Sequence, residues 1–213
     1  MPPPYKVDRQ TDSNSCGYHA LANGINLLKR KTIITSNVLI GSSSAPHPVP
    51  RIGDSEFNSL LAANGLSFKL TRPMAGAQPM PLSDALRAFG AGGVFIAKAK
   101  VTIHDELTGE VSTDYHSIVI TDYKSNPDDI SKDSWNVLCS ACATTKVITA
   151  ENLTYSFGSG AKGVLKKSYV ASIEGCQILE DAATPGGFTS PKNGGFFKDL
   201  FSCCCCFGKY AED

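Results

Sequence analysis

The sequence predicts an α+β fold, with helices in the N-terminal part of the chain and an antiparallel β-sheet in the C-terminal part. Three observations indicate this. Segments with apolar residues at helical spacing dominate the first part, strand-like segments rich in β-branched residues follow, and polar loops or glycines separate the segments. A run of helices before a run of strands is typical of α+β proteins.

The clearest helical segment covers residues 17–28. Leu21 and Ile25 recur in it at helical spacing, and Ser15 stands at the position of a cap. Gly24 indicates that another element packs closely there, because glycine inside a helix otherwise costs about 1 kcal/mol relative to alanine. Further helices are expected at residues 55–64 and in the stretch LSDALRAFGAGG, which glycines end.

The predicted strands alternate apolar and polar residues or are rich in β-branched ones. The segments 115–123 and 135–139 flank the polar loop KSNPDDISKDS, which predicts a hairpin. We expect strands at residues 66–70, 93–101, 115–123, 135–139, 145–149 and 168–175.

The composition changes near residue 183, where TPGGFTSPKNGG begins a stretch typical of a flexible linker. We therefore expect one domain over residues 1–182, and a linker with a cysteine-rich tail over residues 183–213.

The chain of 213 residues carries 20 basic and 20 acidic residues, so its formal net charge is zero. Balanced charge gives no reason to expect a nucleic-acid partner. The N-terminus MPPPYKVDRQ lacks the apolar region of a signal peptide, and no run approaches the roughly 18 apolar residues of a membrane span. We expect a reducing compartment such as the cytoplasm, and thiols that are free rather than joined in a disulfide framework.

Cys16 stands where a polar loop meets the first predicted helix. Unpaired backbone N–H groups and the helix dipole lower the pKa of a cysteine in such a position, which favours the nucleophilic thiolate. Gly17 leaves room for a substrate carbonyl, and Gln10 can supply an amide N–H that forms an oxyanion hole with a backbone N–H. Taken alone, Cys16 could equally be a buried packing residue.

The stretch QTDSNSCGYHALAN resembles the nucleophile region of papain-like cysteine peptidases. In detail it is similar to Ulp-type SUMO proteases, Josephin-type deubiquitinases and related bacterial effector proteases. In these families a glutamine precedes the cysteine, the cysteine opens a helix, and a histidine begins a strand farther along the chain. The resemblance covers two short segments and the order of elements. It implies a papain-like fold, in which the nucleophile helix packs on a C-terminal antiparallel sheet.

The second segment, DYHSIVITDYKS, resembles the strand that carries the family's histidine, which assigns the role of general base to His116. A histidine at the start of a strand is held rigidly and can reach a nucleophile on the facing helix. The other histidines suit this role less. His19 shares the helix of Cys16 and would point along its wall, His47 lies in a proline-rich loop, and His104 is expected in a turn.

The family's Asn or Asp that orients the histidine has no clear counterpart in this sequence. Pairing of the two hairpin strands places Cys139 or Ser140 opposite His116, whereas Asp133 has a family-like sequence distance but should lie near the turn. The orienting group is therefore open among Ser140, Asp133, Asn136 and a backbone carbonyl. A Cys–His dyad without a third member would also be competent.

Cys139 and Cys142 form a C-x-x-C motif, which can mark a redox pair or half of a zinc site. No second pair with ligand spacing accompanies it, so we expect packed thiols, with no metal and no cofactor.

In the tail, four consecutive cysteines stand beside phenylalanines, which suits S-acylation (palmitoylation) and anchoring on a membrane by two or more chains. The alternative is a sticky or partner-binding tail. These four residues are Cys203, Cys204, Cys205 and Cys206.

We therefore expect a cysteine peptidase that acts on a protein substrate through an acyl-enzyme. The resemblance implies a deubiquitinase-like enzyme whose partner is ubiquitin or a ubiquitin-like modifier, and an effector that could be delivered into a host cell. Two alternatives stay open. One is an acyltransferase or transglutaminase-type reaction on the same Cys–His pair, and the other is an inactive binding module tethered to a membrane.

Overall fold

The computed structural model describes residues 7–12, 14–43, 54–73, 81–90, 92–141, 144–159 and 167–182. The α+β prediction is confirmed, because the described chain combines helices with a seven-stranded antiparallel sheet. The helices are α1 (Cys16–Lys29), α2 (Ser36–Gly41), α3 (Asp54–Ala63) and α4 (Leu82–Ala88), with a short 3-10 helix at Ile130–Lys132. The strands are β1 (Phe68–Thr71), β2 (Phe95–Asp105), β3 (Val111–Lys124), β4 (Ser134–Cys139), β5 (Thr144–Thr149), β6 (Thr154–Ser159) and β7 (Lys167–Asp181).

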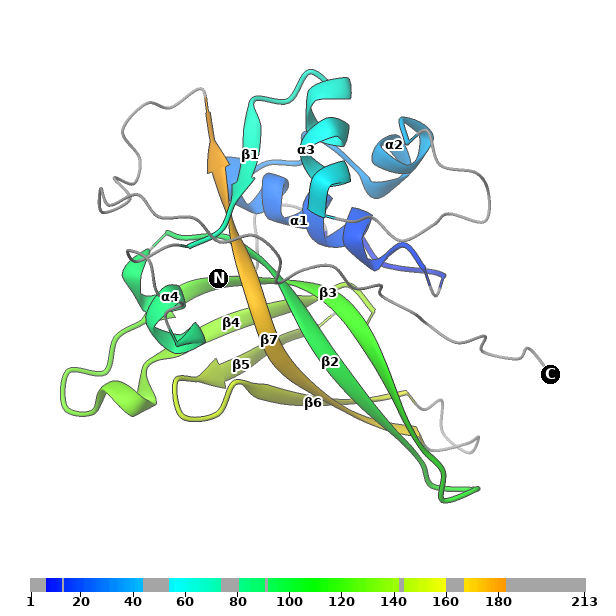
Figure 1. Cartoon of the computed structure of the whole chain (residues 1–213), viewed down its shortest axis with the longest axis vertical. Coiled ribbons are helices and arrows are strands. Elements are labelled where there is room, and N and C mark those ends of the chain that lie inside the picture. Colours follow the sequence, from blue (N-terminus) through cyan, green and yellow to red (C-terminus); the bar gives the residue numbers. More distant parts are fainter. Residues whose placement is uncertain are drawn as a thin grey trace.

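The sheet has the strand order β1-β7-β2-β3-β4-β5, and β6 also pairs with β7. The long strand β7 makes this arrangement possible, because β6 pairs with its first half and β1 with its last residues, while β2 runs along its other edge. The strand β5 lies next to β6, so the strands β2 to β7 curve around a common interior. In Figure 1, α1, α2 and α3 lie together above this curved sheet and α4 lies apart from them.

Two hydrophobic cores cover the two faces of the sheet. Ile118 of β3 belongs to the interior core, which also contains Trp135 of β4. The neighbouring Val119 belongs to the second core, which the helices close with Leu21 and Leu61. Because successive side chains of a strand point to opposite faces, this explains why the middle of β3 is apolar at every position instead of alternating.

Gly24 marks the closest approach of α1 to the sheet. A Cβ atom at this position would lie 2.9 Å from Cδ1 of Ile96 and 3.3 Å from Cδ2 of Leu179. The expected close packing at Gly24 is therefore confirmed. The helix ends as predicted near residue 29, where Arg30 adopts a left-handed conformation with φ 54°.

Two strand boundaries differ from the sequence prediction. β2 continues to Asp105 and β3 begins at Val111, so His104 lies in a strand and His116 lies inside β3 rather than at its start. The cause is the turn between them, where the Asp105 carboxylate accepts hydrogen bonds from the backbone of Leu107 and Thr108. The polar residues before His116 pair with β2 in an exposed hairpin, which strand-forming preferences alone do not reveal. The sequence also missed α2 and β6.

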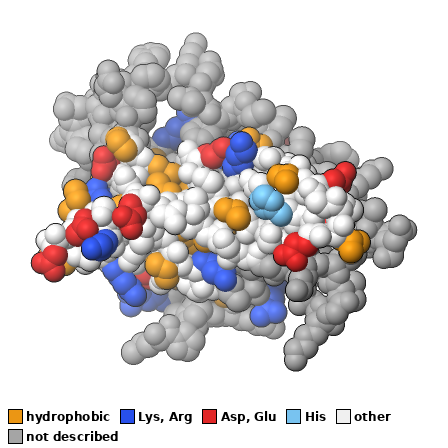
Figure 2. Space-filling view, turned by 90° about the horizontal axis from the view of Figure 1, so that it is seen from below, with side chains coloured by type: hydrophobic (Ala, Val, Ile, Leu, Met, Phe, Trp, Pro, Cys, Tyr) orange, Lys and Arg blue, Asp and Glu red, His pale blue; other side chains and the backbone are white. Residues whose placement is uncertain are grey.

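Charged residues of both signs are mixed on the surface of the described chain. Figure 2 views the molecule from below and shows Lys, Arg, Asp and Glu side chains interspersed on that face, as the balanced composition predicts. Within the described ranges, no helix is both long and apolar enough to cross a membrane. The predicted linker and tail, with Cys203 to Cys206, lie outside the described residues, as do His47 and Cys142.

Candidate active site

Cys16 is the first residue of α1, and its side chain is buried. The turn before it is closed by Asp12, whose carboxylate accepts hydrogen bonds from the backbone of Asn14 and Ser15 and from the Ser15 hydroxyl. Burial acts against ionisation of Asp12, but the bonds from Ser15 and Asn14 outweigh it and lower its pKa. Ser15 occupies the predicted cap position, although its side chain bonds to Asp12 instead of capping the helix. The turn thereby fixes where α1 and Cys16 begin.

Gln10 connects this turn to the end of β4. Its backbone N–H donates to the Ser140 carbonyl at 3.3 Å, and the Ser140 hydroxyl donates to Oε1 of Gln10 at 3.4 Å. Nε2 of Gln10 donates to the Asp12 carbonyl at 2.6 Å. An amide NH₂ group has two hydrogens, so this bond leaves a second one to donate. Gln10 therefore lies in the turn that leads to Cys16, with a donor hydrogen to spare.

His116 lies inside β3 on the same face as Ile118, and 2% of the residue is exposed. Nε2 of its ring is 3.5 Å from Sγ of Cys139. Burial, and secondly the charge of His19, lower the pKa of His116 to about 4. His116 is therefore a neutral imidazole at neutral pH, which is the form a general base requires.

Cys139 is disulfide-bonded, whereas the two other described cysteines, Cys16 and Cys176, form no disulfide. The expectation of packed thiols in the C-x-x-C motif is therefore wrong for Cys139. A disulfide sulfur has no proton, so in the contact with His116 only Nε2–H can donate. This contact selects the Nε2–H tautomer and leaves Nδ1 of His116 with the lone pair that can accept a proton.

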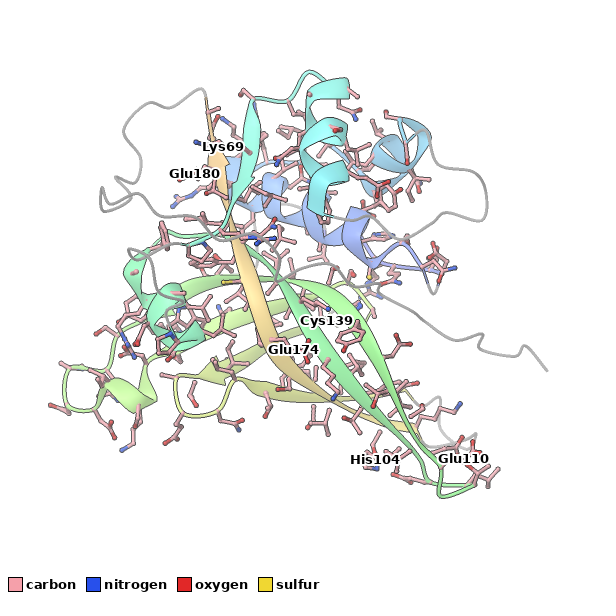
Figure 3. The ribbon with its side chains drawn as sticks, viewed as in Figure 1. Lys69, His104, Glu110, Cys139, Glu174 and Glu180 are labelled. Atoms are coloured by element: carbon pink, nitrogen blue, oxygen red, sulfur yellow. The ribbon has the colours of Figure 1, made fainter. Side chains whose placement is uncertain are left out.

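The register of β3 and β4 explains this contact. Val119 pairs with Leu138, so the end of β4 approaches His116, as the sequence predicted for Cys139 or Ser140. Figure 3 shows Cys139 beneath α1 and His104 far from it, near the tip of the β2–β3 hairpin. Ser140 is buried and bonds to Gln10, so it links the two parts of the site.

Asp133 does not lie at this site, which corrects its assignment as a possible third member. It precedes β4 by one residue, at the end of the strand away from Cys139, about 20 Å in extended chain. Its carboxylate binds Nε of Arg87 at 2.6 Å, the Tyr123 hydroxyl at 2.9 Å and the backbone N–H of Asn126 at 2.7 Å. The Asn126 bond, followed by the Arg87 bond, lowers the pKa of Asp133.

Asn136 is not placed to orient His116 either. Its amide donates to the Asp122 carboxylate at 3.0 Å on the exposed side of the hairpin.

Two more polar groups belong to this region: His19, which the sequence analysis considered only as a base and set aside, and Tyr155, which it missed. His19 is buried on α1, with Nδ1 3.4 Å from Oδ1 of Asp8. Tyr155 of β6 is buried in the interior core, and its hydroxyl has no hydrogen-bond partner. Burial, and secondly the charge of Cys16, raise the pKa of Tyr155, which places the phenol within electrostatic range of the thiol. The spacing of Cys16 and His19 was the one signal available from sequence.

Cys176 provides a contrast among the thiols. Burial in the interior core raises the pKa of Cys176 to about 12, so this thiol stays protonated and unreactive at neutral pH. Among the described residues, no group of three or more His, Cys, Asp and Glu side chains could hold a metal ion.

Comparison with models of known protein families and with curated protein sequences gives no match for this chain.

Proposed function

We propose that the protein is a cysteine peptidase with a papain-like arrangement, in which Cys16 is the nucleophile and His116 is the general base. One set of contacts carries the proposal. Gln10, in the turn that leads to Cys16, is bonded to Ser140, and Cys139, the residue before Ser140, touches His116. Gln10 and His116 thus approach the same end of β4 from distant parts of the sequence, which supports the roles proposed for them.

The helix α1 supports the same assignment. It lies against β3, the strand of His116, and it begins at Cys16. A helix N-terminus stabilises a thiolate through unpaired N–H groups and the dipole. α1 packs on the helical face of the sheet and His116 points to its interior face, but electrostatic effects connect the two sides. The charge of His19 on α1 lowers the pKa of His116, and the charge of Cys16 raises the pKa of Tyr155 in the interior core.

In the proposed reaction, Nδ1 of His116 takes the proton of the Cys16 thiol, and the sulfur attacks the carbonyl carbon of the substrate. The negative charge on the carbonyl oxygen is stabilised by the free amide hydrogen of Gln10 and a backbone N–H at the start of α1. The C–N bond then breaks, and His116 returns the proton to the leaving amine. Water hydrolyses the acyl-enzyme with His116 again as base, which restores the thiol.

Cys139 takes the place of the orienting third member in this proposal. Its sulfur accepts from Nε2–H of His116 and so keeps the ring in the tautomer that presents Nδ1, the task that an Asn or Asp carries out in other such sites. A sulfur acceptor is weaker than an oxygen acceptor, so burial of the ring supplies part of the rigidity.

The resemblance supports a protein substrate, and in particular the C-terminal glycines of ubiquitin or a ubiquitin-like modifier. A panel of ubiquitin-type probes with a C-terminal electrophile tests this directly. We expect covalent labelling at Cys16 at neutral pH, and none in the Cys16→Ala variant, with Cys176→Ala as the matched control thiol. If neither these probes nor a general thiol reagent labels Cys16, the proposal fails. Product transfer to an added amine, in place of hydrolysis, would identify an acyltransferase.

The consecutive cysteines of the tail support a further part of the proposal, that S-acylation of Cys203 to Cys206 holds the enzyme on a membrane. Membrane fractionation of cells that express the chain, with all four residues changed to Ser, tests it. Equal membrane association of the two forms would contradict it.

A further inference from the structure

One side of α1 carries a row of buried polar side chains. They recur at the spacing of a single helix face, so each lies next to the following one. All four residues are at most 4% exposed, which is unusual for polar side chains. They are Cys16, His19, Asn23 and Asn26.

The two asparagines have structural tasks. Asn26 binds the backbone of Ile33 and Ile34, beyond the end of the helix. The Asn23 side chain bonds both backbone polar groups of Asp8. Its Oδ1 accepts from the Asp8 N–H at 2.8 Å, and its Nδ2 donates to the Asp8 carbonyl at 2.9 Å. Asn23 thus fixes the N-terminal segment along α1, and Asn26 fixes the chain that follows the helix.

Asp8 is thereby aimed at His19. One oxygen of its carboxylate accepts from the backbone N–H of Ser36, and the other lies 3.4 Å from Nδ1 of His19. Nδ1 of His19 is buried and has no hydrogen bond, so its contact with Asp8 becomes an ion pair whenever the ring carries a proton. A carboxylate held this firmly serves to fix the ring of His19.

His19 also lies close to the groups that surround Cys16. Helical side chains lean toward the helix N-terminus, so the ring of His19 covers the turn that Cys16 opens, with about 5–6 Å between Cβ atoms three residues apart. The titratable groups that face it are the carboxylates of Asp8 and Asp12 from the N-terminal segment and the neutral imidazole of His116 from β3. The charge of His19 contributes to the lowered pKa values of both Asp12 and His116.

We propose that His19, oriented by Asp8, is a positioning residue whose positive charge stabilises the Cys16 thiolate. The inference rests on the proposed function, because it takes Cys16 as the nucleophile. In this scheme the proton of the thiol passes to His116 and later to the leaving amine, while His19 takes no part in the transfer.

The two imidazoles then have complementary tasks. His19 has a carboxylate partner, whereas His116 is buried and repelled by the charge of His19. A proton that His116 takes from Cys16 is therefore held weakly, which favours its transfer to the leaving group. The same charge on His19 lowers the free energy of the thiolate that remains on Cys16.

The rate of alkylation of Cys16 by iodoacetamide, measured from pH 5 to 10 on the full chain and resolved by peptide mapping, tests this inference. We expect His19→Gln to move the midpoint of the pH profile upward by about one unit, which slows alkylation about tenfold below the midpoint. Asp8→Asn should move the midpoint in the same direction by less. His104→Gln, which removes an imidazole from the distant hairpin, should leave it unchanged, and Cys176 is the internal unreactive thiol.

A purely structural role for His19 would lower thermal stability without moving this midpoint. If His19→Gln does not fold, Asp8→Asn carries the test. An unchanged midpoint in the folded variants overturns the inference, even where the electrophile probes show that Cys16 is the nucleophile of a peptidase. A shifted midpoint in a protein that no ubiquitin-type probe labels would support His19 as the charge beside Cys16 and would count against the proposed function.

Discussion

Two buried polar clusters lie at opposite ends of β4, and they differ in how completely their atoms are paired. At the start of the strand, Asp133 binds Arg87, Tyr123 and the backbone of Asn126, with all three bonds at 2.9 Å or less. The guanidinium of Arg87 is also bonded to Asp84. This cluster ties α4, β3 and the loop before β4 together.

At the end of β4, two buried polar atoms lack a hydrogen bond. They are Nδ1 of His19 and the Tyr155 hydroxyl, and Nε2 of the nearby His116 contacts a sulfur atom. Nε1 of Trp135, near the start of β4, is also buried without a partner, so the lack of a partner does not by itself mark a functional group. The comparison teaches that the Asp133 carboxylate, with three short bonds, is part of the scaffold, whereas the two imidazoles are the candidates for chemistry.

The largest effect is expected at His116. His116→Ala should slow labelling of Cys16 by a ubiquitin-type electrophile about a thousandfold, because the thiol loses the base that removes its proton. The second-order rate constant of labelling measures this, and His104→Ala on the hairpin is the control. A rate close to that of the native protein would assign His116 to the scaffold and remove the contrast between the two ends of β4.

Asp133→Asn should lower the stability of the fold and leave the reactivity of Cys16 unchanged. Loss of the charge leaves Arg87 without its principal partner, and we expect a decrease of about 3 kcal/mol in the free energy of unfolding, less than for a fully buried pair because Arg87 is a quarter exposed. Denaturant titration measures it. Asp84→Asn is the matched control, since this more exposed partner of Arg87 should contribute under about 1 kcal/mol. Slower labelling of Cys16 in folded Asp133→Asn would contradict the separation of the two clusters.

The smallest effect is the change of folding stability with pH. In the native state His116 stays neutral down to its pKa of about 4, whereas in the unfolded chain it takes up a proton near its ordinary value of 6.5. The unfolded state therefore binds more protons between these values, and stability that is present above pH 6.5 is lost as the pH falls toward 4, on the order of 2 kcal/mol. His116→Gln should show a flatter stability profile across this window, as measured by denaturant titration at each pH. Parallel profiles would show that His116 is not buried as described.

Much of the fold followed from local pattern. The periodicity of α1 and the β-branched run in β3 identified these elements, and Gly24 marked the close approach of α1 to Ile96. The sequence does not predict the outer part of the β2–β3 hairpin. Its polar residues are stabilised by cross-strand pairing and not by burial, so they lack an apolar pattern.

The candidate site, like the fold, could be predicted from the sequence only in part. The sequence identified Cys16, Gln10 and His116 from residue type, spacing and resemblance, because these features lie in the chain itself. It could not choose the partner of His116, since Asp133 and Cys139 lie at the two ends of the same hairpin strand and only the register shows which end approaches the ring.

By itself, then, the sequence determined the class of the fold and named Cys16, Gln10 and His116 as candidates for the chemistry of a thiol peptidase, because periodicity and residue type are local properties. The tertiary structure decided that Asp133 pairs with Arg87, that Cys139 contacts His116 and that Asp8 faces His19. These contacts join segments that lie up to 46 residues apart. They depend on strand register and on the path of the N-terminal segment along α1, which no local pattern encodes.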